Sequence, residues 1–194
     1  MATPTLRLAQ DRDADELLSR DPLALLVGML LDQQFPMERA FGSPWLLAQR
    51  LDRRGLDAAE IAAWDPDAFV KVMAGPPALH RYPAAMASRI QVLCAYLVKE
   101  YQGAAAELWL GAATGTELLK RVRALPGFGE QKARIFVALL GKQLGVRPRG
   151  WREAAGPYGM EGSHRSVADV TDPDSLAQVR AFKQAAKRAT AEGG

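Results

Sequence analysis

The sequence of 194 residues predicts an all-α protein. Helix starts are marked three times by an aspartate followed by a proline: Asp21-Pro22, Asp65-Pro66 and Asp172-Pro173. Aspartate is a preferred N-cap, and proline fits the first helical turn, where its missing N–H is not needed. Between residues 82 and 101, apolar side chains recur every three or four positions, which is the period of a buried helix face. No segment shows convincing β-alternation, so we expect helices almost throughout.

The expected helices can be placed in order along the chain. An apolar helix begins at Pro22 and is stopped or kinked by Pro36 just after Gln34, because proline cannot continue the hydrogen-bond ladder. Further helices are expected from Asp65, across residues 82–103, within residues 116–144 on both sides of a short turn, and from Pro173. Residues 147–166 are rich in glycine and proline and are expected to form an irregular loop. The length suits one domain, residues 1–194, with a single core or with two small lobes that share a cleft.

The composition excludes several kinds of site. Cys94 is the only cysteine in the sequence, which rules out a disulfide framework, a four-cysteine zinc site and a cysteine-ligated iron–sulfur cluster within this chain. No metal site built from side chains is expected. The opening residues lack the layout of a signal peptide, and the longest apolar run, residues 23–31, is too short to span a bilayer. We therefore expect a cytoplasmic protein without a membrane partner, nucleoid-associated if it is bacterial.

Basic residues gather in two parts of the chain, although the net charge is only +3. Nine lysines and arginines and a single acid, Glu130, lie between residues 120 and 152. Residues 176–191 carry four more basic side chains and no acid, whereas residues 11–21 hold five acids and two arginines. Clustering of this kind is typical of a phosphate-binding face, although a solvated helix surface would give the same pattern.

The turn at residues 125–129, Leu-Pro-Gly-Phe-Gly, contains more than a plain helix link needs. Gly127 and Gly129 let another backbone approach without a Cβ in the way, and the N–H groups that start the second helix attract an anion. Leu125 and Phe128 are expected to fix the turn to the core. Two basic residues just inside the second helix would place charge near a bound phosphate: Lys132 and Arg134. Contacts of this type hold a nucleic-acid backbone without reading its sequence.

The segment LPGFGEQKA resembles the hairpin of helix-hairpin-helix DNA glycosylases of the GPD type, which are related to endonuclease III. The resemblance extends over residues 21–146 and implies a two-lobed helical bundle with a helix-hairpin-helix motif that binds double-stranded DNA. It also implies a site for a monovalent cation, K⁺ or Na⁺, held by carbonyl groups of residues 125–129. No other cofactor is required, the iron–sulfur cluster of endonuclease III relatives is absent, and we expect a monomer.

Two further segments add DNA contacts under the same resemblance. The segment MLLDQQF is similar to a helix end at which a glutamine fills the gap left by a flipped base, and this places that role on Gln34. Alternatively, Gln33 and Gln34 cap a helix broken by Pro36. The segment before the helix at residues 82–103 is similar to a loop that wedges into the minor groove, with Tyr82 near the wedge position. An aromatic residue at a helix start is otherwise a core anchor.

The catalytic carboxylate is the point at which this sequence departs from the family. The stretch after the second hairpin helix carries arginines where an aspartate is expected, and its nearest acid is Glu153. Beyond an insertion, HRSVADV resembles the family's Val-Asp segment and nominates Asp169, which could equally cap a helix or form a salt bridge inside the fold. Gln131 stands where bifunctional members have a nucleophilic lysine, so Schiff-base chemistry is not expected.

A base pocket is expected from four side chains: Trp151, Tyr158, His164 and Arg165. The aromatic rings would sandwich a flipped base, and the basic groups would touch its edge or the adjacent phosphate. The alternative is that Trp151 and Tyr158 pin an irregular loop to the core.

The sequence therefore favours a base-excision DNA repair protein, a monofunctional DNA glycosylase that flips a damaged or mispaired base and cleaves its N-glycosidic bond. Asp169, or else Glu153, would supply the carboxylate that stabilises positive charge on the sugar. The alternative is a DNA-binding or lesion-sensing protein that has kept the scaffold without the chemistry.

Overall fold

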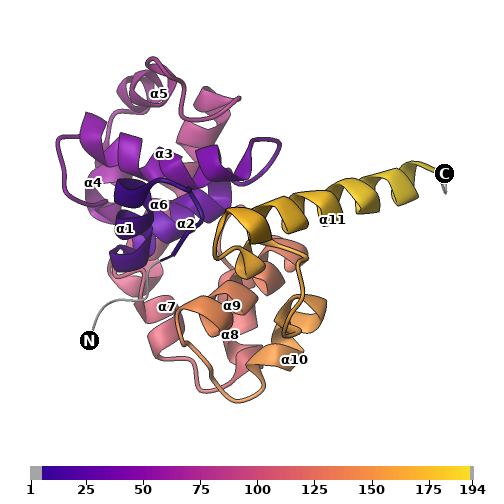
Figure 1. The fold of residues 1–194 in the computed structure, drawn as a ribbon. Helices are drawn as coiled ribbons and strands as arrows, with labels where there is room; N and C mark the ends of the chain where they lie inside the picture. The colour runs from indigo at the N-terminus through magenta and orange to yellow at the C-terminus, as the bar shows by residue number, and fades with distance from the viewer. Residues whose placement is uncertain (1–5, 193–194) are drawn as a thin grey trace.

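The chain folds into helices joined by short loops in a computed structural model that describes residues 6–192 (Figure 1). Within this range there are eleven α-helices, two short 3₁₀ helices and no β-strands, so the all-α prediction is confirmed. The first six helices are α1 (Arg12–Arg20), α2 (Pro22–Leu31), α3 (Met37–Arg50), α4 (Ala58–Ala63), α5 (Pro66–Ala74) and α6 (Pro83–Tyr101). The remaining elements are α7 (Glu107–Leu110), α8 (Gly115–Arg123), α9 (Glu130–Gln143), α10 (Trp151–Ala155), η1 (Gly156–Gly159), η2 (Val167–Asp169) and α11 (Pro173–Glu192).

Aspartate side chains start several of these helices, as the Asp-Pro pairs predicted. The Asp21 carboxylate accepts hydrogen bonds from the first-turn amides of Leu23 and Ala24, both at 3.0 Å, and so caps α2. Its second oxygen accepts from the amide of Leu56 at 2.8 Å, which ties the start of α2 to the loop before α4. Asp65 caps α5 and Asp172 bonds the first turn of α11 in the same manner.

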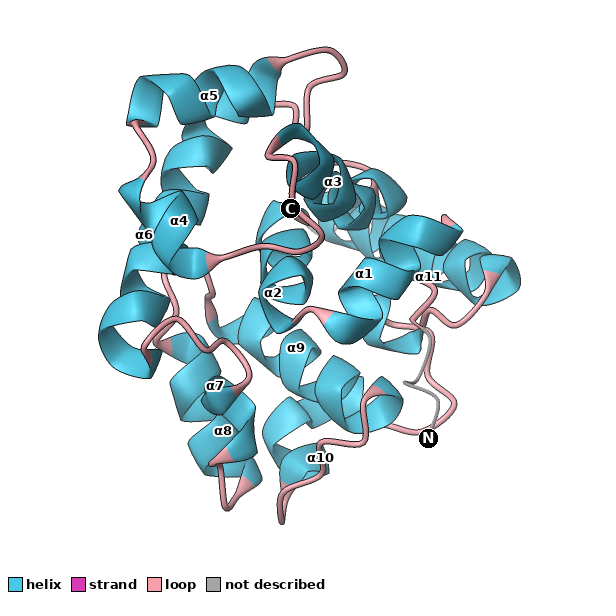
Figure 2. Ribbon diagram, turned by 90° about the vertical axis from the view of Figure 1, so that its left-hand side faces the viewer, coloured by secondary structure: helices cyan, strands magenta, loops and turns pink. Residues whose placement is uncertain are grey.

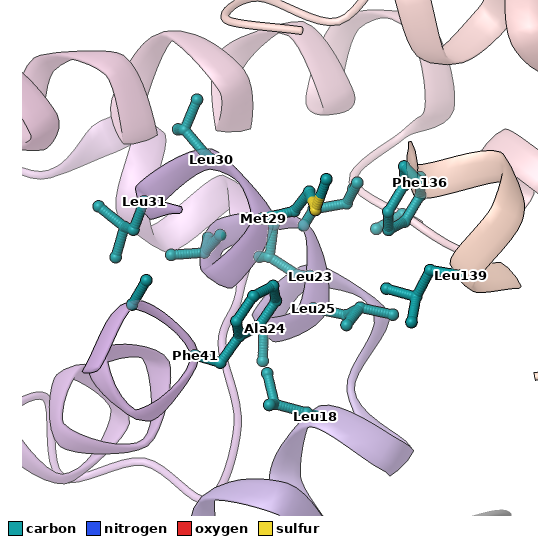
Figure 3. Close-up of a cluster of buried hydrophobic side chains, with 14 of the residues drawn as sticks. Leu18, Leu23, Ala24, Leu25, Met29, Leu30, Leu31, Phe41, Phe136 and Leu139 are labelled. Carbon is teal, nitrogen blue, oxygen red and sulfur yellow. The ribbon is translucent and has the colours of Figure 1, made fainter. Parts of the chain in front are cut away.

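Helix α2 is the most deeply buried element of the described chain. All of its residues after Pro22 are buried, so it is apolar on every side, which is the pattern of a helix enclosed by others. Figure 3 shows its side chains meeting Leu18 of α1 and Phe41 of α3 on one side, and Phe136 and Leu139 of α9 on the other. Helix α2 therefore connects elements that are far apart in the sequence.

The other helices are arranged around this centre. Helices α4 and α5 pack against α6, α1 and α2 pack against α3, and α8, α9 and α10 pack against one another. Figure 1 shows α1 to α6 in the upper part of the view and α7 to α10 in the lower part, with α11 projecting outward. In the perpendicular view of Figure 2, α2 again lies next to α9. The buried apolar side chains of both parts form one continuous core.

Two expectations about element boundaries were wrong. Helix α2 ends at Leu31 rather than at Gln34, because Asp32 leaves the helical conformation with ψ of 66° and Gln34 takes a positive φ of 51°. The segment 147–166 is only partly irregular, since α10 and η1 lie within it. Gly150, at φ 77°, lets the chain turn into α10. Among residues 6–192, no helix combines the length and the apolar character needed to cross a membrane.

The contact between α9 and α10 predicts opposite effects for two helical glycines. A Cβ on Gly141 of α9 would lie 2.3 Å from Cε3 of the buried Trp151 ring, so Gly141→Ala should lower the free energy of unfolding by about 2 kcal/mol or more. A Cβ on Gly42 of α3 would meet no atom within 4 Å, so Gly42→Ala should raise it by about 0.5–1 kcal/mol. Urea unfolding of both variants checks this, and equal effects would contradict the packing described for Trp151.

Candidate functional site

The turn at residues 125–129 joins α8 to α9 and is fixed to the core from within. The Phe128 amide donates to the Leu125 carbonyl at 3.1 Å, and both side chains are buried, Leu125 to 2% and Phe128 to 4% exposure. Gly127 has a φ of 85°, which a residue with a Cβ rarely adopts, and a Cβ there would lie 2.5 Å from Cδ1 of Leu30. The backbone of the turn therefore lies directly over the end of α2.

A hollow opens above this turn. It has a volume of about 550 Å³ and is lined by residues 125–129 together with Ser88, Arg89 and Val92 of α6. Gly129 is the N-cap residue of α9, and no side chain caps this helix end. The amides of the first turn of α9 thus start at the hollow, next to an exposed guanidinium, which is a suitable environment for an anion.

One acid lies at this helix end, and two arginines neutralise it. Glu130, the first residue of α9, pairs through one carboxylate oxygen with Arg123 at 2.7 Å and through the other with Arg134 at 2.6 Å. Arg134 also donates to the carbonyl of Ala154 at 2.9 Å. The sequence predicted that Arg134 points to a phosphate, but its guanidinium is engaged with Glu130 and α10 in the structure.

Lys132 is directed into the protein. Its ammonium donates to the carbonyls of Met29 at 2.7 Å and Leu30 at 3.2 Å, and so satisfies the C-terminal end of α2. Burial lowers the pKa of Lys132 to about 8, although the charge of Asp32 opposes the shift. From the sequence we expected Lys132 to lie beside a phosphate. In the structure its ammonium instead bonds the end of α2 and so joins α9 to α2.

The loop after α2 presents one glutamine outward and holds the other inward. The Gln33 side chain donates to the Leu30 carbonyl at 2.8 Å and accepts from Arg89 at 3.0 Å, whereas Gln34 is exposed. His80 is 1% exposed and contacts this loop from the protein interior. Its Nδ1 accepts from the amide of Tyr82 at 3.0 Å, which leaves Nε2 to donate to the Gln33 carbonyl at 3.0 Å. Burial lowers the pKa of His80, which favours this neutral form.

Tyr82 lies at the start of α6 and is 44% exposed, with the guanidinium of Arg81 5.4 Å from its ring centroid. The core-anchor alternative for Tyr82 is therefore wrong. Because His80 bonds the carbonyl of Gln33 and the amide of Tyr82, one buried imidazole places both Gln34 and Tyr82 at the surface.

The four side chains expected to form a base pocket do not converge. Trp151 is 6% exposed and packs against Gly141, and the guanidinium of Arg165 lies 5.2 Å from the ring of Phe182. The Tyr158 hydroxyl accepts from Gln131 at 2.9 Å. Of the four, His164 alone lines the hollow of about 310 Å³ that contains Asp169. The structure agrees with the alternative, in which Trp151 and Tyr158 pin this segment to the core: Trp151 is buried against α9, and Tyr158 is partly buried against the core.

The two carboxylates nominated from the sequence have different surroundings. Asp169 is 4% exposed in its side chain and pairs with Lys142 of α9 at 2.5 Å. It also accepts from the Ser163 hydroxyl at 3.1 Å and the Arg165 amide at 2.8 Å, and completes a capping box with Ser166. Donors thus occupy both of its oxygens, which makes it a structural link between α9 and η2. Glu153 is exposed on α10.

Sequence reasoning missed Arg89, which lines the hollow and bonds the Gln33 side chain. The sequence indicates no special role for Arg89, because an arginine on the solvent side of an amphipathic helix is ordinary. Within residues 6–192, no group of three or more histidines, cysteines or acids is placed to hold a metal ion. Comparisons with models of protein families, with curated proteins and with solved structures gave no match.

The buried ammonium predicts a pH-dependent stability. Because the pKa of Lys132 is lower in the folded state than in the unfolded chain, the unfolded state binds more protons between about pH 8 and the ordinary lysine pKa of 10.5. This group should therefore add stability as the pH rises through that window, by up to about 1 kcal/mol per pH unit. Lys132→Met removes the contribution, so unfolding of both proteins at pH 8, 9 and 10 should give a smaller slope for the variant. Equal slopes would mean that Lys132 is solvated.

Proposed function

We propose that this protein binds the backbone of double-stranded DNA through a helix-hairpin-helix motif formed by α8, residues 124–129 and α9. The observation that carries the proposal is the uncapped start of α9, which opens on the hollow lined by the turn and Arg89. A phosphate there would meet backbone amides, the positive end of a helix dipole and a guanidinium. In this proposal α1 to α6 and α7 to α10 are the two lobes of the scaffold.

The neighbouring loops support the same surface. Arg89 lines the hollow and also bonds Gln33, so the hollow and the exposed Gln34 lie on adjoining parts of the molecule. A duplex whose phosphate sits on the hairpin would meet Gln34 and, farther along the start of α6, Tyr82. An exposed amide can fill the space left by an extruded base, and an exposed ring can stack on a neighbouring one.

A monovalent cation suits the same turn. Carbonyl oxygens of residues 125–129 carry no net charge and are ligands of the type that K⁺ and Na⁺ accept. The Leu125 carbonyl already accepts from the Phe128 amide and the Gly129 carbonyl from the Ala133 amide, so the carbonyls of residues 126–128 would hold the ion. Such an ion would add positive charge beside the phosphate.

We further propose that the protein acts in base-excision repair as a monofunctional DNA glycosylase, working as a monomer in the cytoplasm. It would extrude a damaged or mispaired base and hydrolyse its N-glycosidic bond, a reaction that needs a carboxylate near the sugar. Asp169 and Glu153 are the carboxylates nominated from the sequence. The second candidate function is lesion binding without catalysis, and the engagement of both Asp169 oxygens favours it.

Gly129→Ala tests the hairpin with the least disturbance of the fold. Gly129 has an ordinary φ of −75°, and a Cβ there would meet no atom within 4 Å, so the variant should fold normally. The added methyl group would stand where a phosphate approaches the amides. We expect DNA affinity to fall about tenfold without change in sequence preference, measured by fluorescence anisotropy at fixed salt.

Two further variants complete this experiment. Gly42→Ala, the same change at an open position on α3, should leave the affinity unaltered. Arg89→Ala should lower the slope of log K against log salt by about one, because one phosphate contact is lost. Normal affinity in a folded Gly129→Ala protein would refute the hairpin contact.

Catalysis is tested by single-turnover incubation with duplexes that each carry one lesion: uracil, hypoxanthine, 8-oxoguanine, an alkylpurine, or adenine opposite 8-oxoguanine. We expect alkali-labile abasic sites from at least one duplex, because the proposed reaction removes the base and leaves the backbone intact. Salt-sensitive binding to all the duplexes with no abasic product would instead select lesion binding without catalysis.

A further inference from the structure

Helix α11 is held to the protein at its beginning and projects outward over the rest of its length (Figure 1). Its first part packs against η2, and the side chains of Leu176 and Val179 are buried. The ring of Phe182 lies 5.2 Å from the guanidinium of Arg165. In contrast, every side chain of residues 184–191 is exposed. The core therefore stabilises the first part of α11 but not the segment 184–191.

The side chains of α11 gather positive charge on one face. Residues 176–191 contain no acid and four basic residues: Arg180, Lys183, Lys187 and Arg188. At 3.6 residues per turn these four positions fall within about 140° of the helix circumference, and we call this side of α11 the basic face. Lys183 and Lys187 are four residues apart, a spacing at which like charges destabilise a helix. The helix dipole does not compensate this cost, because the last turn of α11 holds no basic residue.

The projecting segment lacks the usual sources of helix stability. Isolated helices shorter than about 12 to 15 residues are marginal in water, and an exposed polar helix depends on ion pairs between successive turns. Residues 176–191 cannot form such pairs with one another, because they include no acid. Among the described side chains, the ion pair of α11 is the one between Arg180 and Glu38 of α3. A polyanion along the basic face would remove the repulsion between its cations.

The ion pair between Arg180 and Glu38 also shows where the basic face begins. Glu38 lies in the first turn of α3, four residues after the exposed Gln34. The basic face therefore starts close to the loop that carries Gln34, which belongs to the surface proposed to contact DNA, and it extends away from that loop. The phosphates of a duplex held at this surface have the charge that the basic face complements.

Two other partners fit α11 less well. A helix that lies on a membrane surface needs a broad face of large apolar side chains, whereas alanine is the only apolar residue type in residues 184–191. A second copy of α11 would bring another row of like charges, and alanine offers little apolar surface for a seam between two helices. The observations thus favour nucleic acid.

We propose that the basic face of α11 is a second DNA-binding surface, which contacts backbone phosphates of the duplex beyond the position of Gln34. The inference rests on the proposed function, in which the hairpin holds another phosphate of the same duplex. Lys183, Lys187 and Arg188 would donate to phosphate oxygens, while Arg180 stays paired with Glu38. Such contacts carry no sequence information and raise the affinity for any duplex.

The test is the double variant Lys187→Gln with Arg188→Gln, at two exposed positions of the basic face. Glutamine removes the charge and keeps a good helix propensity, so the variant should fold normally. Fluorescence anisotropy with an undamaged duplex should show the slope of log K against log salt reduced by about two, and the affinity at low salt lowered about tenfold. Arg12→Gln with Lys99→Gln removes the same charge at exposed positions on α1 and near the end of α6, and should preserve both values.

Hydrogen exchange locates the contact within the chain. In the free protein the amides of residues 184–191 should exchange rapidly, because no packing protects this segment. Addition of the duplex should slow their exchange about tenfold or more in the wild type, and less than about threefold in the variant Lys187→Gln with Arg188→Gln.

Each other outcome overturns the inference. An unchanged slope in the α11 variant would place the basic face off the DNA, and an equal loss in the variant of α1 and α6 would show an effect of net charge alone. Protection of residues 184–191 by vesicles of anionic phospholipid, or by a higher protein concentration, but not by the duplex would select a membrane or a second copy. If Gly129→Ala weakens binding and the α11 variant does not, the hairpin contact stands without α11. A wild type that binds no duplex refutes the proposed function, and this inference with it.

Discussion

The bond between Lys132 and the end of α2 is the interaction on which the arrangement of the candidate site depends. A helix ends with carbonyl groups that have no partner in the helix, and here the Lys132 ammonium of α9 donates hydrogen bonds to the carbonyls of Met29 and Leu30. A positive charge at that position is also favoured by the helix dipole. Because Lys132 lies in the first turn of α9, the bond fixes the hairpin turn relative to the loop that carries Gln34. The close approach of Gly127 to Leu30 is a second contact between the hairpin turn and the end of α2.

Features that depend on neighbouring residues could be predicted from the sequence. The Asp-Pro helix starts, the long helix α6 and the turn at residues 125–129 follow from capping, from apolar spacing and from the properties of glycine. Lys132 shows the limit of this reasoning. Its partners lie 102 and 103 positions away in the sequence, and nothing near Lys132 indicates that the side chain points inward. The sequence located a basic residue beside the hairpin, but the direction of its side chain is a property of the assembled fold.

The same limit explains the segment 147–166. Its glycines and prolines predicted an irregular loop, and its aromatic residues were compatible with either a base pocket or an anchor. Gly141, ten residues before Trp151, makes Trp151 an anchor. Because Gly141 has no side chain, α9 leaves the space in which the indole packs. That contact gives α10 a buried side and allows a helix of five residues to form. A short helix of this kind is specified by tertiary packing rather than by its own sequence.

Asp169 shows why residue type alone does not identify a reactive group. The sequence neighbours of Asp169 nominate it as the catalytic carboxylate, but in the structure an ammonium, a hydroxyl and a backbone amide occupy its oxygens. A carboxylate already bonded on both oxygens has little to offer a developing cation.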